Sequence, residues 1–172
     1  MTVDQDDRTQ PRSRAPEPTR TLAPGARGYW AVEALGWAIP LVILSLVAAR
    51  GLTEGAGAPA ALGVLLPAAA ALVGLVGVAV VPGLRWAHWR YDVRDEEIDL
   101  RSGAFTVTRT LIPMARVQHV DTKRTVISQL FGLAAVTIHT AAGRNVIPAL
   151  NEPDAAAIRD RIAELARTPD EP

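Results

Sequence analysis

Two long apolar segments dominate the pattern of hydrophobic and polar positions along the chain. They cover residues 29–49 and 58–81, and both are rich in Leu, Val and Ala. At about 1.5 Å of rise per residue, helices of these lengths reach roughly 31 and 36 Å, enough to cross a hydrocarbon core of ~30 Å. Between Gly28 and Leu84 the charged residues are Glu33, Arg50 and Glu54. The pattern therefore predicts a transmembrane hairpin of two helices over residues 29–84.

Small residues recur at three- and four-residue spacing along the second apolar segment. Gly63, Ala70, Gly74 and Gly77 fall on one face of the predicted helix, where they allow another helix to approach closely. The helix that packs there is the first span, a second copy of the chain or a different protein. Packing within the hairpin is the simplest of these interpretations.

From residue 85 onward the pattern changes to the short alternations that are typical of β-strands. Turn signals at Ser102-Gly103 and at Ala141-Ala142-Gly143 predict two hairpins. A short helical or irregular segment is expected over residues 126–131. Strands are expected over residues 89–94, 97–101, 104–112, 117–122, 133–140 and 145–149.

The end of the chain is predicted to form an amphipathic helix over about residues 152–167. Asn151 is placed as its N-cap, with Asp154 three residues on as a capping-box acid. Ala155, Ile158, Ile162 and Leu165 then form an apolar stripe that should pack on the sheet. The expected fold class is a membrane protein, with an α-helical transmembrane hairpin followed by a mainly-β barrel or sandwich and a C-terminal capping helix. This outline resembles that of a pleckstrin-homology (PH) domain.

The overall charge hides three unlike regions. The 172 residues carry 18 basic and 18 acidic side chains and no cysteine, which argues against nucleic-acid binding, disulfides and thiol chemistry. Residues 1–28 are charged, proline-rich and almost free of apolar side chains, so we expect a disordered N-terminal tail. The predicted organisation is thus a tail over 1–28, the hairpin over 29–84 and a PH-like domain over 85–172.

Basic and aromatic residues predict the orientation in the membrane. Five arginines precede the first span and three closely follow the second, whereas the intervening loop has one arginine. The positive-inside rule places both termini in the cytoplasm, as expected of a multi-pass protein of the plasma membrane. Aromatic side chains near the span ends are expected at headgroup level, namely Tyr29, Trp30, Trp86 and Trp89.

The candidate chemistry of the chain is sparse. His88, His119 and His139 have no acidic or histidine neighbour at the sequence spacing of a metal site. Alternation puts Asp95, Glu97 and Asp99 on one side of a strand, and a solvated sheet face accounts for these acids without acid–base catalysis. No phosphate-binding loop or catalytic triad pattern is present. We therefore predict a protein that is not an enzyme and holds no metal or cofactor.

Three segments resemble a known family. They are residues 110–120 (TLIPMARVQHV), 127–133 (ISQLFGL) and 136–143 (VTIHTAAG). They are similar to the bacterial PH-like domain membrane proteins of the YdbS-like family, which have two transmembrane helices and one PH-like domain. The resemblance covers roughly residues 29–166, and its motif residues are Ile112, Pro113, Arg116, Val117, Gln118, Val120, Leu130, Phe131, Gly132 and Gly143.

Two functions follow from the resemblance and the residues. The favoured one is a protein-interaction or assembly subunit in the lipid bilayer, whose partner is a membrane protein, such as a larger PH-like relative, or a second copy. The alternative is sensing of anionic lipid or envelope stress, with headgroup contacts from Arg116, Lys123 and Arg124. The phosphoinositide site of other PH domains is not expected, because the corresponding turn, Arg94-Asp-Glu-Glu97, is acidic.

Overall fold

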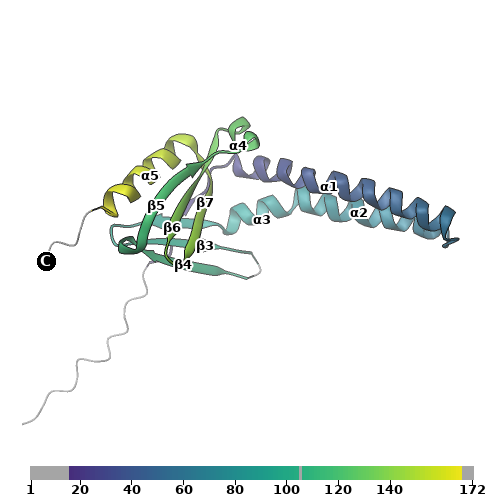
Figure 1. Cartoon of the computed structure of the whole chain (residues 1–172), viewed down its shortest axis with the longest axis horizontal. Helices are drawn as coiled ribbons and strands as arrows, with labels where there is room; N and C mark the ends of the chain where they lie inside the picture. The colour runs from purple at the N-terminus through teal and green to yellow at the C-terminus, as the bar shows by residue number, and fades with distance from the viewer. Residues whose placement is uncertain (1–15, 105, 168–172) are drawn as a thin grey trace, which may run out of the picture.

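The computed structural model describes residues 16–104 and 106–167. A pair of long helices projects from one end of a β domain (Figure 1). The helical part consists of α1 (Ala26–Arg50), a π-helical turn η1 (Gly51–Gly55), α2 (Ala61–Ala79) and α3 (Val81–His88). The second long helix begins after Pro59, because the residue before a proline disfavours helical geometry. The helix also continues past residue 81 through α3, beyond its expected end.

The two helical stretches Ala26–Gly55 and Ala61–His88 are long and apolar enough to cross a membrane. In their most apolar windows only 0% and 6% of the residues are buried inside the protein. A core helix of a soluble protein would be covered by its own domain, whereas these side chains face outward and need an apolar surrounding. The predicted pair of apolar helices is confirmed.

The β domain contains two antiparallel sheets. The first has the strand order β1-β2-β3-β4 and the second the order β5-β6-β7. The strands are β1 (Arg20–Thr21), β2 (Arg90–Val93), β3 (Glu97–Ser102), β4 (Thr108–Pro113), β5 (Val117–Lys123), β6 (Leu133–Thr140) and β7 (Gly143–Asn151). Every strand expected after residue 85 is present, with its ends shifted by a few residues.

The sheets form a PH-like sandwich and not a closed barrel, since β4 and β5 are joined by the 3-10 turn η2 (Met114–Arg116) and do not pair with each other. Helix α5 (Glu152–Leu165) packs against β5, β6 and β7. In its predicted stripe, Ala155, Ile158 and Ile162 are buried and Leu165 packs, partly buried, against the core. Arg161 reaches across to Asp95 at the β2–β3 turn, with 2.9 Å between nitrogen and oxygen. The helix packs on a sheet, as the sequence predicted, and it also reaches the other sheet through Arg161, which the sequence did not indicate.

The cap of α5 differs in detail from the expectation. Asn151 occupies the N-cap position, but its side chain makes no capping hydrogen bond to the backbone. Its amide instead donates to the Asp154 carboxylate at 3.0 Å. The helix start therefore depends on position and packing rather than on a capping box.

The N-terminal segment shows the largest departure from the expected domain organisation. Residues 1–15 of the predicted disordered tail lie outside the described residues. Residues 16–28 are part of the fold: β1 pairs with β2, and Leu22 is only 1% exposed. The Ala23 N–H donates to the Ala149 carbonyl at 3.2 Å, and the Trp86 indole N–H donates to the Leu22 and Ala23 carbonyls. The few apolar side chains of this segment are buried because they join the core that the helices and sheets form together.

Candidate functional site

Four residues of the family motif line a single groove of about 630 Å³ between the two sheets. Ile112 and Pro113 end β4, Arg116 ends η2, and Gln118 lies on β5. The β6–β7 turn, with Thr140, Ala141 and Ala142, completes the lining. The groove is therefore the place where the open sandwich and the motif coincide. The sequence identified the motif, but it gave no sign that these residues share a groove with that turn.

Strand β4 borders this groove and is the last strand of its sheet. In the part of the chain that the structure describes, its outer edge pairs with no other strand. Leu111 on this strand is 48% exposed and Val107, just before it, is 53% exposed. An edge strand with unpaired backbone groups and exposed apolar side chains is able to accept another strand.

Four further motif residues lie in the core or in turns. Val117 and Val120 pack, partly buried, against the core. Gly132 and Gly143 adopt positive φ angles of 62° and 137° in turns. Because a β-carbon disfavours these backbone angles, glycine suits both positions.

Leu130 and Phe131 are separate from the groove. They belong to the segment formed by α4 (Val126–Leu130) and the residue after it, close to the start of α1 (Figure 1). Leu130 is 80% exposed. Phe131 lies so close to α1 that a β-carbon added at Gly28 would come within 2.8 Å of its ring. This pair therefore marks the junction with the helices, unlike the rest of the motif.

The small-residue face of α2 is only partly used for contact with α1. Ala70 and Gly74 are buried, and a β-carbon at Gly74 would lie 3.0 Å from that of Ala38. A β-carbon at Gly63 would lie 3.5 Å from the Thr53 methyl group, and one at Gly77 would meet nothing within 4 Å. Packing within the hairpin thus accounts for Ala70, Gly74 and Gly63, but not for Gly77.

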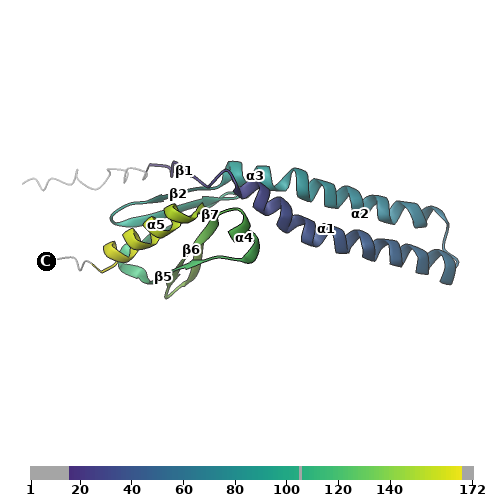
Figure 2. The same ribbon diagram turned by 90° about the horizontal axis from the view of Figure 1, so that it is seen from above.

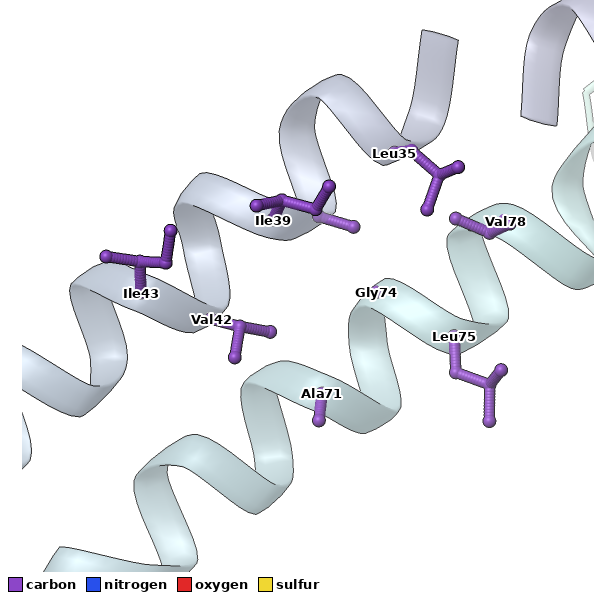
Figure 3. A pocket seen from close by; sticks show the side chains of 9 residues that line it. Leu35, Ile39, Val42, Ile43, Ala71, Gly74, Leu75 and Val78 are labelled. Atoms are coloured by element: carbon purple, nitrogen blue, oxygen red, sulfur yellow. The ribbon is translucent and has the colours of Figure 1, made fainter. Parts of the chain in front are cut away.

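Beside this contact, an apolar crevice of about 400 Å³ runs between the two long helices. Figure 3 shows Leu35, Ile39, Val42 and Ile43 of α1 along one wall and side chains of α2 along the other. No charged side chain lines it. Within a bilayer such a crevice accepts lipid tails or an apolar helix.

The aromatic residues expected at headgroup level lie at the junction of helices and sheets. Trp30 is buried in the core, with 3% exposure, so its ring is covered by protein and does not face lipid headgroups as expected. Tyr29, Trp86 and Trp89 pack, partly buried, against the same core. Two guanidinium groups cover indole rings: Arg85 lies 4.4 Å from the Trp30 ring centre and Arg27 lies 4.0 Å from that of Trp86. These two contacts join α1 to α3. The packing of the aromatic rings against the core joins this end of the helices to the β domain.

The three cations predicted to contact lipid headgroups lie in different surroundings. Arg116 lines the groove between the sheets. Arg124 forms an ion pair with Glu152. Lys123 lines a third pocket, where the helices meet the second sheet. The structure thus separates this predicted set, and whether any member touches lipid stays a prediction.

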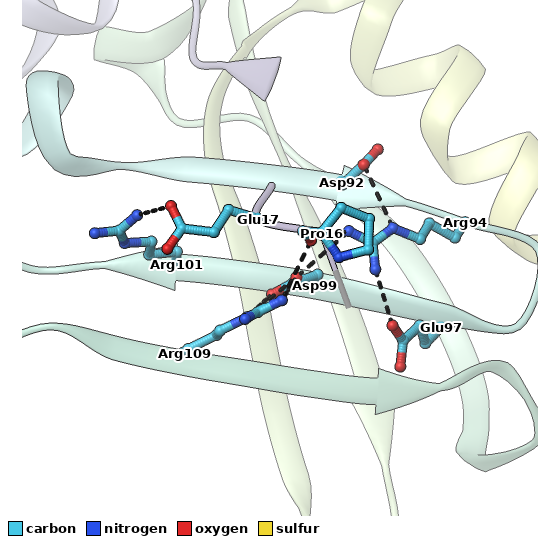
Figure 4. A network of polar contacts seen from close by, with 8 residues as sticks. All are labelled: Pro16, Glu17, Asp92, Arg94, Glu97, Asp99, Arg101 and Arg109. Carbon is cyan, nitrogen blue, oxygen red and sulfur yellow. Dashed lines mark hydrogen bonds and ion pairs between the residues drawn. The ribbon is translucent and has the colours of Figure 1, made fainter. Parts of the chain in front are cut away.

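A polar network covers the outer face of the first sheet (Figure 4). Asp99 is fully buried and accepts hydrogen bonds from Arg109 Nε and Nη2, the shortest 2.6 Å long. Arg94 lies 3.7 Å from the same carboxylate and 3.0 Å from Glu97. The expectation that Asp99 lies on a solvated face is therefore wrong. Pro16 crosses above Asp99, and the Pro16 carbonyl accepts hydrogen bonds from Arg94 and Arg109.

Two ionisable groups of this sheet have shifted pKa values. Hydrogen bonds to Asp99 raise the pKa of Arg109, so this guanidinium stays charged. Burial raises the pKa of Tyr91, and nearby Asp154 adds to the rise while Arg20 opposes it. Both groups support the fold and neither lies in a cleft with a nucleophile.

The histidines are less isolated than the sequence indicated. His139 Nε2 lies 2.9 Å from an Asp121 carboxylate oxygen, and its ring centre is 5.7 Å from that of His119. The sequence spacing showed no such neighbours, but the antiparallel pairing of β5 with β6 brings residues that are distant in sequence close together in space. Within residues 16–104 and 106–167, no three His, Cys, Asp or Glu side chains gather as a metal site would require.

The comparisons with known proteins agree with this architecture. Residues 30–166 match the protein family described as Bacterial PH domain. The chain is 46% identical over 97 residues to the UPF0699 transmembrane protein YdbS of Bacillus subtilis (strain 168), which covers 56% of this chain and 61% of that protein. It is 26% identical over 106 residues to the UPF0699 transmembrane protein YdbT of the same strain, covering 59% of this chain and 20% of that protein. The matches thus span less than two thirds of either relative. No solved structure matches the chain significantly.

Proposed function

Because the chain belongs to the bacterial PH domain family, we propose that it is a membrane-anchored, non-enzymatic interaction module that assembles with another membrane protein. The two apolar helices hold it in the bilayer, and the PH-like sandwich presents the binding surface. The partner in this proposal is a larger membrane protein with a related PH-like domain. A second copy of the chain is the other partner that fits the same surface.

The groove beside β4 is the observation that carries this proposal. It combines an unpaired strand edge, an exposed Leu111 and four residues of the family motif. A strand from a partner would satisfy the backbone groups of β4, and apolar side chains of that strand would cover Leu111. The groove also contains the polar side chains of Arg116 and Gln118, which would select the partner by hydrogen bonding.

The similarity to two proteins of one bacterium supports a PH-like partner. The matched region is most of YdbS by length but only a fifth of YdbT. The same strain therefore has a small and a large protein with related sequences. We propose that this chain corresponds to the small member of such a pair and binds a counterpart of the large one.

The orientation in the membrane forms part of the same proposal. The β domain joins the helices both at the start of α1 and at the end of α3 (Figure 1), so the segment before α1 and the sandwich lie on one side. The arginines near these two ends support a cytoplasmic location for that side by the positive-inside rule. The proposed interaction therefore occurs at the cytoplasmic face of the bacterial plasma membrane.

A photo-crosslinking amino acid at Leu111 tests the proposal in native membranes. We expect an adduct with a membrane protein that contains a PH-like domain or with a second copy, identified by mass spectrometry. The matched control places the same amino acid at the exposed Ala157 of α5, on the side of the helix that faces solvent. The control position should give no such adduct.

A charged substitution in the groove provides a second test of the proposal. Leu111→Asp should abolish co-purification of the partner, since burial of an unpaired carboxylate in the contact is costly. Ala157→Asp should leave it unchanged. A solubilised protein that is strictly monomeric and free of partners, with no adduct at Leu111, would overturn the proposal.

A further inference from the structure

A basic pocket of about 290 Å³ lies where the helices meet the second sheet. Tyr29 and Trp30 of α1 line it from the first helix, and Arg85 lines it from α3. Lys123, at the end of β5, and Arg144, near the start of β7, contribute from the sheet. Three elements far apart in sequence thus bring three cations into one pocket.

These cations lack acidic partners in the part of the chain that the structure describes. Most other arginines of the β domain form ion pairs, among them Arg101 with Glu17 and Arg161 with Asp95. Arg85, Lys123 and Arg144 form none, although Glu33 lines the same pocket. Like charges held together raise the electrostatic potential, so an anion that enters gains from all three.

The pocket lies at the ends of the two apolar helical stretches, where spans of this length would leave a bilayer. Trp30 and Arg85 flank the apolar stretches of α1 and α2 and are stacked on each other at 4.4 Å. A ligand there is next to the headgroups of the leaflet that the helices enter. By contrast, the β2–β3 turn, which is the acidic counterpart of the usual phosphoinositide site, lies at the far end of the β domain (Figure 2).

Helix α4, the neighbour of this pocket, has the features of a membrane-contacting segment. Val126 and Leu130 are 78% and 80% exposed, yet the helix is well fixed by a capping box between Thr125 and Ser128. A rigid helix that exposes large apolar side chains beside a membrane span buries them in the headgroup region. Ser128 of the same helix lines the pocket, so this contact and the pocket face one surface.

We propose that this pocket binds the phosphate of an anionic phospholipid in the adjacent leaflet, with Arg85, Lys123 and Arg144 as its cationic contacts. Glu33 accepts a hydrogen bond from a headgroup hydroxyl, which suits a glycerol headgroup. The apolar side chains of α4 rest in the headgroup region next to it. This inference does not depend on the proposed protein partner, which occupies the groove at β4.

Lipid binding to the full chain tests the inference. The protein is purified in detergent and titrated with phosphatidylglycerol or with phosphatidylcholine of the same acyl chains, and bound lipid is counted by native mass spectrometry. The pocket variant is Lys123→Gln/Arg144→Gln. The matched control, Arg159→Gln/Arg167→Gln, removes one charge from α5 and one just after its end, both outside the pocket.

We expect the wild type and the control to prefer phosphatidylglycerol. In the pocket variant this preference should be about 25-fold smaller than in the wild type, the effect of removing two cations near an anionic surface. Equal binding of both lipids by the wild type would overturn the inference, as would equal losses in the two variants. In a further arm, inorganic phosphate is titrated against the bound lipid, up to a concentration equal to that of the lipid. Displacement of the lipid by phosphate at equal concentration would show a site for a free phosphate and overturn the lipid assignment.

Discussion

Asp99 and Tyr91 lie on neighbouring strands of the first sheet, and burial changes the chemical behaviour of both polar side chains. Tyr91 pairs with Leu100 across β2 and β3, and Asp92 pairs with Asp99. The carboxylate of Asp99 is fully buried but keeps its partners, because Arg94 and Arg109 surround it. Removing one partner of such a group costs more than the pair contributes, since the other is left uncompensated. The acid is therefore structural and its role belongs to the fold.

At the same scale, the raised pKa of Tyr91 predicts a loss of stability at alkaline pH. Below its ordinary pKa of 10.0 the phenol is neutral in both the folded and the unfolded chain. As the pH rises past that value the unfolded chain loses this proton first, so the free energy of unfolding falls. Tyr91→Phe should remove this contribution. Urea unfolding followed between about pH 9 and 11 measures it.

Tyr29→Phe serves as the control for this experiment because it leaves Tyr91 in place. Its free energy of unfolding should fall with pH as steeply as that of the wild type. The expectation would be contradicted by a pH dependence of Tyr91→Phe that matches the wild type over the same range.

At the scale of elements, the two long helices show that the role of a small residue depends on whether it faces the neighbouring helix. Gly74 and Gly77 are one turn apart on α2 and look equivalent in sequence. Gly74 is buried against Ala38, whereas a side chain at Gly77 would meet nothing within 4 Å. Close approach of the helices therefore depends on one glycine, and the other is free for substitution.

Substitution of each glycine by leucine distinguishes these positions. Gly74→Leu inserts atoms at a contact that already measures 3.0 Å for a β-carbon, so the helices must separate, at a cost of about 1–3 kcal/mol in the free energy of unfolding. Gly77→Leu should be neutral or stabilising by up to about 1 kcal/mol, because leucine favours the helix more than glycine does. Thermal unfolding in detergent measures both. Equal destabilisation by the two changes would contradict this account.

At the scale of the whole molecule, the N-terminal segment connects the helices to the two sheets. Residues 16–25 run from the polar network of the first sheet, through β1, to the start of α1. The carbonyls of Leu22 and Ala23 accept hydrogen bonds from the Trp86 indole of α3, and the Ala23 N–H donates to the Ala149 carbonyl of β7. One segment thus contacts the helices and both sheets, which fixes the sandwich relative to the membrane spans.

Leu22 provides the test of this arrangement. Its side chain is 1% exposed, so Leu22→Ala should lower the free energy of unfolding by about 2–4 kcal/mol through the lost burial and the cavity left behind. Leu52→Ala, at a residue 40% exposed in η1, should cost about 1 kcal/mol or less. Denaturant unfolding of the full chain, followed by tryptophan fluorescence, measures both. A mobile tail would make Leu22→Ala as mild as Leu52→Ala.

The order of the elements could be predicted from the sequence alone. Long apolar runs without charges and short alternating runs are local patterns, and each reports the surroundings of its own segment. The two spans, the strands after residue 85, α4 and the buried stripe of α5 were therefore predicted close to their actual positions. The family resemblance came from the same local motifs and is confirmed over residues 30–166.

The tertiary structure alone decided which distant residues meet. Residues 16–28 look like an unfolded tail, because their few apolar side chains become buried only in a cleft formed by other elements. The groove at β4 and the basic pocket at Arg85, Lys123 and Arg144 likewise join segments that have no spacing in common. Local patterns record whether a residue is covered, but the partner that covers it depends on how the helices and sheets pack, and that packing determines the candidate binding surfaces.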